Sequence, residues 1–229
     1  MLTNTKIVSS ALVLVTASFG TVATAQAGVD SVPFDNPNGL ADTYAFTDGS
    51  SSTGLFNDPI VSGDALLFTP DNFIALSDES SDSITETVCL TLTANEGLQF
   101  SDLTFAMAGD FAILGESVAT AGAVLTVENL DTNVTLSTDP DSDVFFNGDG
   151  LFELGDSIEL PDGWSNVLVK ITGDLFAESD GQGSAAIQFK SVGLNAGTEA
   201  IVPIPAAAFA APLLLIGGLK ARKRFAKKR

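Results

Sequence analysis

The stretch from Ser83 to Thr93 limits the fold more than any other, because apolar and polar residues alternate along it. The residues on its apolar side are Ile84, Val88, Leu90 and Leu92. Those on its polar side are Thr85, Thr87, Cys89, Thr91 and Thr93. A period of two is typical of a half-buried β-strand. Glu86 interrupts the apolar side, so we expect it near an end or rim of the sheet.

Other short runs rich in valine, isoleucine, phenylalanine and threonine are separated by glycine, aspartate and asparagine, which is the strand signature. The expected strands cover residues 43–46, 98–107, 111–114, 118–128, 134–136, 151–160, 167–172 and 185–192. Turns are expected at 94–97, 108–110 and 131–133, and a linker at 193–200. Turn signals recur about every 8 to 12 residues and no long amphipathic period is present. The sequence therefore predicts an all-β fold, an antiparallel β-sandwich of the jelly-roll type.

The first 27 residues have the composition of a secretory signal peptide. Lys6 supplies a positive charge, residues 7–19 are mostly apolar, and Ala25-Gln26-Ala27 has the small-x-small pattern of a signal-peptidase site. An uncleaved anchor is the alternative, but the apolar run is short. We therefore expect residues 1–27 to be removed and residues 28–200 to form one domain of ordinary size.

The C-terminal region, residues 201–229, has the composition of a membrane-spanning segment with a basic flank. No residue from Ile201 to Leu219 is charged. At about 1.5 Å per helical residue this run reaches a little under 30 Å, enough to cross a bilayer core. Seven of the ten basic residues follow it: Lys220, Arg222, Lys223, Arg224, Lys227, Lys228 and Arg229. The positive-inside rule places this cluster in the cytoplasm and the bulk of the chain outside. One transmembrane helix is thus predicted, and its simplest interpretation is a permanent anchor.

A proline motif lies at the N-terminal end of this segment and consists of Val202, Pro203, Ile204, Pro205 and Ala206. Prolines here favour an extended, protease-accessible approach to the membrane. Motif, apolar run and basic cluster together resemble the PEP-CTERM-like sorting tails, in particular the variant named for Val-Pro-Leu-Pro-Ala. Ile204 stands where leucine is usual, and Ala221, Phe225 and Ala226 interrupt the basic cluster.

The resemblance covers only about the last thirty residues. It implies an exosortase-type transpeptidase in the cell envelope as a partner, cleavage near the motif, and transfer to the cell surface or the extracellular space. A GPI signal fits less well, because such tails end in apolar residues.

Charge is strongly segregated along the chain. All 29 acidic residues lie between residues 28 and 200, with only Lys170 and Lys190 as basic residues, which gives this part a formal charge of −27. Such a charge repels nucleic acid and anionic membrane surfaces, so no nucleic-acid partner is expected. It is compatible with solubility at high salt, with divalent cations, and with uncharged partners such as an exopolysaccharide.

Catalytic chemistry is restricted because the chain contains no histidine. This excludes Ser-His-Asp and Cys-His machinery, histidine-ligated zinc and the usual general base near neutral pH. Cys89 is the single cysteine, so no disulfide can form within the chain. Two carboxylates could hydrolyse a polysaccharide, but the sequence singles out no pair. The chain is therefore expected not to be an enzyme.

One acidic loop resembles the start of a calcium-binding loop. Asp139, Asp141 and Asp143 place oxygen ligands at alternate positions, as in the first part of an EF-hand. The pattern then fails, because Val144 occupies the glycine position and Gly150 stands where a bidentate glutamate belongs. Calcium at these three aspartates is the one candidate cofactor, and a solvated acidic turn is the alternative.

Trp164 and Tyr44 are candidates for stacking on a sugar ring, with a place in the core as the alternative. The favoured function is that of an exported, non-catalytic surface or extracellular-matrix protein sorted through its tail. A calcium-assisted carbohydrate-binding module is the second hypothesis, and a polysaccharide-degrading enzyme with two catalytic carboxylates is the third.

Overall fold

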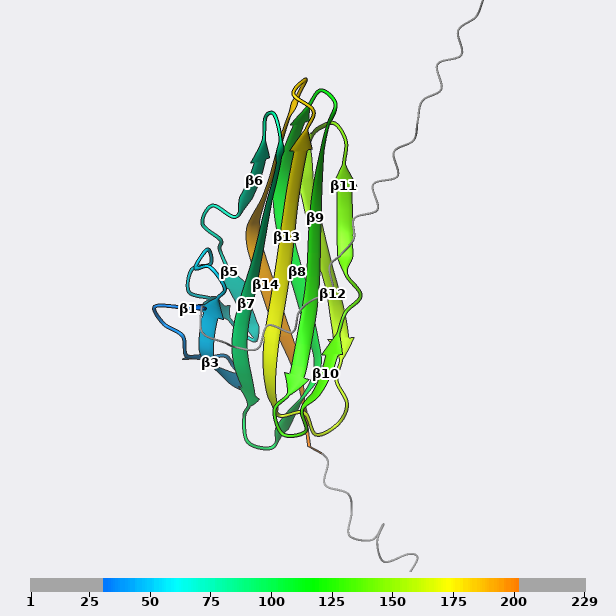
Figure 1. Cartoon of the computed structure of the whole chain (residues 1–229). Helices are drawn as coiled ribbons and strands as arrows, with labels where there is room; N and C mark the ends of the chain where they lie inside the picture. Colours follow the sequence, from blue (N-terminus) through cyan, green and yellow to red (C-terminus); the bar gives the residue numbers. More distant parts are fainter. Residues whose placement is uncertain (1–30, 202–229) are drawn as a thin grey trace, which may run out of the picture.

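The alternating segments form two antiparallel sheets in the computed structural model, which describes residues 31–201 (Figure 1). The eight-stranded sheet has the order β1 (Val32–Pro33), β3 (Tyr44–Ser51), β7 (Ser81–Ala94), β13 (Asn166–Ser179), β9 (Ser117–Asn129) and β10 (Val134–Ser137), with β2 (Gly39–Leu40) beside β3 and β11 (Asp141–Phe145) beside β9. The six-stranded sheet has the order β12 (Gly148–Glu159), β8 (Leu98–Leu114), β14 (Ser184–Ala200), β5 (Ala65–Phe68) and β4 (Ile60–Ser62), with β6 (Ile74–Ser77) beside β14.

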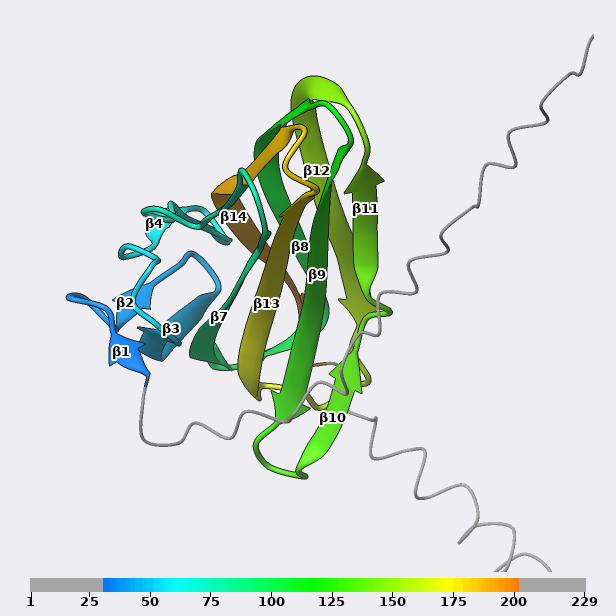
Figure 2. The same ribbon diagram turned by 45° about the horizontal axis from the view of Figure 1, so that its top comes forward.

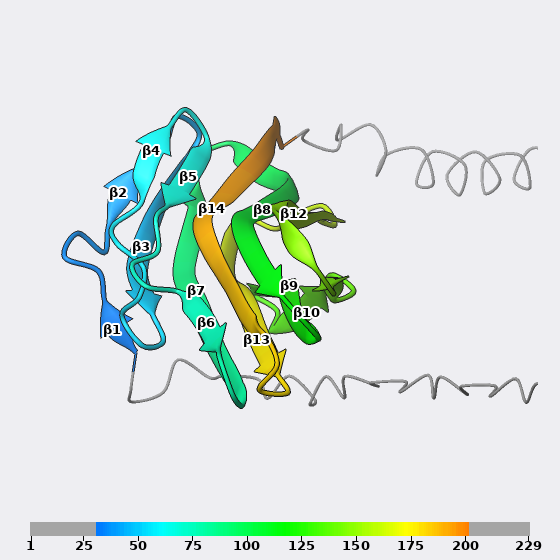
Figure 3. The same cartoon turned by 90° about the horizontal axis from the view of Figure 1, so that it is seen from above.

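The two sheets form the two layers of a sandwich, and the strands β7, β8 and β9 alternate between them (Figures 2 and 3). The strands β12, β13 and β14 alternate in the same way. Every strand pairing is antiparallel. These observations confirm the predicted all-β antiparallel sandwich, and the assignment to the jelly-roll type stays a prediction.

The core lies between the sheets and is built from their inward-facing residues. On β7 these include Val88, Leu90 and Leu92, all buried, as the alternation predicted. A continuous series of phenylalanine ring contacts also runs through the core, with centroid distances from 4.1 to 6.5 Å. Its members are Phe34, Phe68, Phe56, Phe73, Phe189, Phe152, Phe145 and Phe111.

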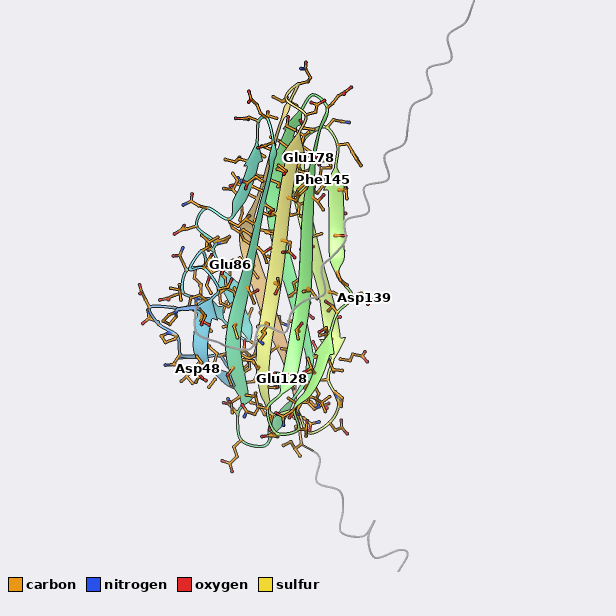
Figure 4. The ribbon with its side chains drawn as sticks, in the orientation of Figure 1. Asp48, Glu86, Glu128, Asp139, Phe145 and Glu178 are labelled. Carbon is orange, nitrogen blue, oxygen red and sulfur yellow. The ribbon has the colours of Figure 1, made fainter. Side chains whose placement is uncertain are left out.

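Glu86 lies inside the sandwich, so its predicted place near an end or rim of the sheet is wrong (Figure 4). It is completely buried and accepts hydrogen bonds from the hydroxyl groups of Ser51 (2.6 Å), Ser52 (2.9 Å) and Thr53, and from the backbone N–H of Thr53 (3.0 Å). These donors come from the end of β3 and the residues just after it. These donors replace the water molecules that would otherwise bond to the carboxylate, so Glu86 can be buried in the core.

The predicted turn at 108–110 is also wrong, because β8 continues through it. Gly109 makes this continuation possible: a Cβ atom there would lie 2.1 Å from the carbonyl oxygen of Gln188 and 2.5 Å from the ring of Phe152. Gly109 therefore allows β8 to lie close to its neighbouring strands and does not mark a turn.

The predicted linker at 193–200 is the last part of β14, which pairs with β8 as far as Ala200. The predicted turns at 94–97 and 131–133 are confirmed, with Gly97 and Asn133 at positive φ. The signal peptide and the sorting motif with its transmembrane and basic segments lie outside the described residues, apart from Ile201. Between residues 31 and 201 there is no helix long and apolar enough to cross a membrane.

Candidate functional site

The described domain has an open pocket of about 440 Å³ at the end where β13 turns into β14. We call this end the distal end, since β14 runs from it to Ala200 at the opposite, proximal end (Figure 1). The residues that line this distal pocket are Gly115, Glu116, Ser117, Val118, Phe146, Asn147, Glu178 and Asp180. Figure 4 labels Glu178 and the neighbouring Phe145 near this end.

The ring of Phe146 is the largest apolar group of the distal pocket and is 68% exposed. Its neighbour Phe145 ends β11 and packs against the rings of Phe111 (4.1 Å between centroids) and Phe152 (5.4 Å). Successive residues of an extended chain point to opposite sides, so anchoring Phe145 inside turns Phe146 to the solvent.

Two tight turns hold the polar wall of the distal pocket together. In the β8–β9 turn, Gly115 has φ of 71°, and a Cβ atom there would lie 2.6 Å from the carbonyl oxygen of Gln182 in the β13–β14 turn. In the second turn the Ser179 hydroxyl donates to the Gly183 carbonyl (2.8 Å), and the Gln182 N–H donates to a carboxylate oxygen of Asp180 (2.9 Å). The carboxylate of Asp180 is therefore held by its own turn.

The distal pocket combines an exposed aromatic ring with hydrogen-bonding groups. Glu116, Glu178 and Asp180 supply carboxylate acceptors, and the side-chain amide of Asn147 can both donate and accept. A ligand that has hydroxyl donors around an apolar C–H face matches both parts. The lining contains no lysine or arginine, so an anionic ligand does not fit.

The three aspartates predicted to bind calcium are not brought together. Asp139 lies in the loop before β11 (Figure 4), and Asp141 and Asp143 lie on the strand itself. One carboxylate oxygen of Asp141 accepts the backbone N–H of Gly155 (2.9 Å), so Asp141 caps part of the edge of β12. Within residues 31–201 no group of three or more aspartate, glutamate, cysteine or histidine side chains could hold a metal ion.

Tyr44 and Trp164 are core residues, so the prediction that they stack on a sugar is wrong. Tyr44 is completely buried, its hydroxyl donates to the carbonyl of Asp64 (2.9 Å), and its ring contacts that of Phe100. Burial raises the pKa of the Tyr44 phenol, and the nearby Asp64 carboxylate raises it further. Trp164 is only 5% exposed, and its carbonyl accepts the N–H of Phe100 (2.8 Å).

Cys89 lies on the outer face of the eight-stranded sheet, opposite Ser50 and Lys170 on the neighbouring strands. Burial raises the pKa of its thiol, the Lys170 charge lowers it and the Asp48 charge raises it, with a higher value as the net result. A thiol with a raised pKa is a poor nucleophile near neutral pH.

Sequence reasoning missed Phe146, although the sequence contains a signal for it. Two adjacent phenylalanines at a strand end cannot both enter the core, because their side chains point to opposite sides. The doublet Phe145-Phe146 therefore indicates one exposed ring. Which of the two is exposed depends on the pairing of β11 with β9, which places Phe145 opposite the inward-facing Ala119.

No protein-family model matches the chain, and no curated protein matches it. Among solved structures, a family 29 carbohydrate-binding module is 15% identical over 69% of this chain and 81% of that chain, with a TM-score of 0.23. A family 61 module solved with β-1,4-galactotriose is 12% identical over 56% of this chain and 68% of that one, with a TM-score of 0.20. Eiger TNF from S. frugiperda is 11% identical over 49% of this chain and 68% of that one, with a TM-score of 0.26. At such TM-scores these similarities carry no argument about function.

Proposed function

We propose that this protein is an exported, non-catalytic surface or matrix protein that binds an uncharged polysaccharide through its distal pocket. The observation that carries the proposal is the exposed ring of Phe146, which stands beside hydroxyl-binding groups in a pocket of about 440 Å³. Burying an aromatic ring is favourable, and a ring that stays exposed to water does not gain this free energy in the unbound protein. A large exposed ring next to a concave site therefore indicates a position where a ligand binds.

The charge of the domain supports an uncharged ligand. With a formal charge of −27 between residues 28 and 200, an anionic polymer is repelled before it reaches the distal pocket. A neutral polysaccharide is not repelled, and its hydroxyl groups can donate to the carboxylates of Glu116, Glu178 and Asp180.

The placement of the distal pocket supports display away from a membrane. The 17 residues of β14 separate the distal end from Ala200, which corresponds to roughly 55 Å at the rise of a β-strand. The proline motif begins at Val202, directly after the described domain. If the tail spans a membrane until an exosortase-type enzyme processes it, the distal pocket faces outward.

Binding is tested with the purified full-length protein and soluble neutral polysaccharides: dextran, galactomannan, β-1,3-glucan and the native host's own neutral exopolysaccharide. We expect at least one of them to bind in a calorimetric titration. Phe146→Ala is expected to weaken that binding at least about tenfold, equivalent to about 1.4 kcal/mol. Val134→Ala is the matched control, since Val134 is 49% exposed on β10, outside the distal pocket. Absence of binding to every polymer, or equal binding by Phe146→Ala, would overturn the proposal.

The sorting part of the proposal is tested by intact mass and C-terminal peptide mapping of the protein from its native host. We expect the chain to end within Val202–Ala206, or to carry an added group there. A peptide that persists through Arg229 in the membrane fraction would show that the tail is a permanent anchor.

A further inference from the structure

A second group of polar side chains lies on the outer face of the six-stranded sheet, where β8 and β14 pair. The Gln188 amide donates to one carboxylate oxygen of Asp110 (2.7 Å), and the Lys190 ammonium group donates to the other. The side chains of Lys190 and Asp110 are 53% and 29% exposed. Ion pairs this exposed contribute little to stability, so stability alone is a weak explanation for this arrangement.

A β-bulge directs Lys190 into this group. The register between β14 and β8 shifts between Phe189 and Ser191, which leaves Lys190 as the extra residue. The shift also explains why Phe189 and Val192, three residues apart, are both buried. Bulges of this kind commonly re-aim a side chain next to a functional site.

An open groove of about 420 Å³ lies beside the polar group. Its lining is formed by Ile74, Asp110, Phe111, Ala112, Asp149, Gly150, Leu151, Ala186, Ile187 and Gln188. On the outer face, Ala112 pairs with Ala186, and Asp110 pairs with Gln188 on one side and Leu151 on the other. Leu151 is 84% exposed, so one wall of the groove is an apolar side chain with most of its surface in water. Asp110 and Gln188 therefore lie between Leu151 and Ile74 in one row across the sheet, and the two small alanine side chains lie in the next row.

The chemistry of the groove points to the same ligand class as the distal pocket. Asp110 can accept from a hydroxyl, whereas Lys190 and Gln188 can donate to one, and the charges of Asp110 and Lys190 balance each other. Partial burial raises the pKa of Asp110, but the hydrogen bonds from Lys190 and Gln188 and the ammonium charge lower it by more, so the carboxylate stays ionised. Leu151 and Ile74 offer apolar contact to the C–H face of a sugar ring. A ligand with a strong net charge gains nothing from a balanced ion pair.

We propose that this groove is a second saccharide-binding site, which makes the domain bivalent and able to cross-link two polysaccharide chains. The proposal rests on the proposed function of the distal pocket. The groove lies on the outer face of the six-stranded sheet, whereas Val118 and Glu178 of the distal pocket pair side by side in the other sheet. The two sites therefore lie in different layers of the sandwich, as Figure 3 shows for their strands.

The first measurement is the calorimetric stoichiometry of the full-length protein with a disaccharide cut from whichever polymer binds, because a longer fragment would reach across both sites. We expect two disaccharides per wild-type chain, and one per chain for Phe146→Ala, Asp110→Ala and Leu151→Ala. Glu153→Ala on the same outer face is the control and should keep two, because Glu153 does not line the groove. Unfolding midpoints close to that of the wild type show that Asp110→Ala and Leu151→Ala are folded.

The second measurement is light scattering from the protein mixed with the long polymer. Wild-type protein should increase the particle size, whereas each single-site variant should bind the polymer without increasing it. A stoichiometry of one for the wild type, no residual binding by Phe146→Ala, or unchanged cross-linking by Asp110→Ala and Leu151→Ala would overturn the second site and leave the distal pocket intact. No binding by the wild type would instead overturn the proposed function.

Discussion

The outer faces of the two sheets differ in the side chains that they carry. On the eight-stranded sheet hydroxyl groups bond to neighbours on the next strand, as in Thr87 with Thr172 (2.9 Å) and Thr126 with Ser137 (2.9 Å). On the six-stranded sheet the central rows hold small residues such as Ala106 opposite Gly193, and the polar group around Asp110 stands beside a groove.

The difference shows how one alternating pattern produces two kinds of surface. A threonine face satisfies much of its own hydrogen bonding and stabilises the sheet through cross-strand pairs. A face of alanine and glycine forms few such cross-strand pairs, but it leaves space in which Leu151 and Lys190 can contact a ligand. We therefore expect substitutions of the cross-strand threonine pairs to change mainly stability, and those of the side chains that line the groove to change mainly binding.

The largest effect is expected where the six-stranded sheet depends on its small residues for close packing. Gly109→Ala should lower the free energy of unfolding by about 3 kcal/mol or more, because the added methyl group meets the Gln188 carbonyl and the Phe152 ring. Gly193→Ala is the matched control on the paired strand, since its nearest contact is the Ala106 carbonyl at 3.8 Å. Denaturant unfolding measures both. Equal free energies of unfolding for the two variants would mean that the strands around Gly109 can move apart without a loss of stability.

The second-largest loss of stability is expected when the buried carboxylate of Glu86 on the inner face of the eight-stranded sheet is removed. Glu86→Ala should lower the free energy of unfolding by about 2 kcal/mol, because the buried hydroxyl of Ser51 and the backbone N–H of Thr53 lose their acceptor. Glu153→Ala, which removes an exposed glutamate from β12, should change stability by less than about 0.5 kcal/mol. If Glu86→Ala were as stable as the wild type or more so, the buried carboxylate would be a net cost that the core tolerates.

The smallest effect tests whether the threonine pairs stabilise the eight-stranded sheet. A double-mutant cycle with Thr87→Val and Thr172→Val should give a coupling energy of about 0.5 kcal/mol. The oligosaccharide affinities of both sites should not change in these variants. A coupling energy of zero, or a loss of binding, would contradict the division of roles between the two outer faces.

The sequence was sufficient where a side chain's place follows from its neighbours along the chain. The alternation of Val88, Leu90 and Leu92 with threonines predicted β7 and its two faces, because the period of a strand is a local property of the backbone. The absence of histidine restricted the chemistry in the same direct way. The apolar residues of β14 even change phase between Phe189 and Val192, so the bulge at Lys190 can be read from the sequence.

Only the tertiary structure decided the features that depend on distant partners. Glu86 is buried because residues 51–53, more than thirty positions earlier, supply its donors. Gly109 continues a strand because Gln188 and Phe152 approach it, and Phe145 enters the core because β11 pairs with β9. Tyr44 and Trp164 are buried for the same kind of reason. Local pattern determines which way a residue points, whereas the packing of the two sheets determines what it meets.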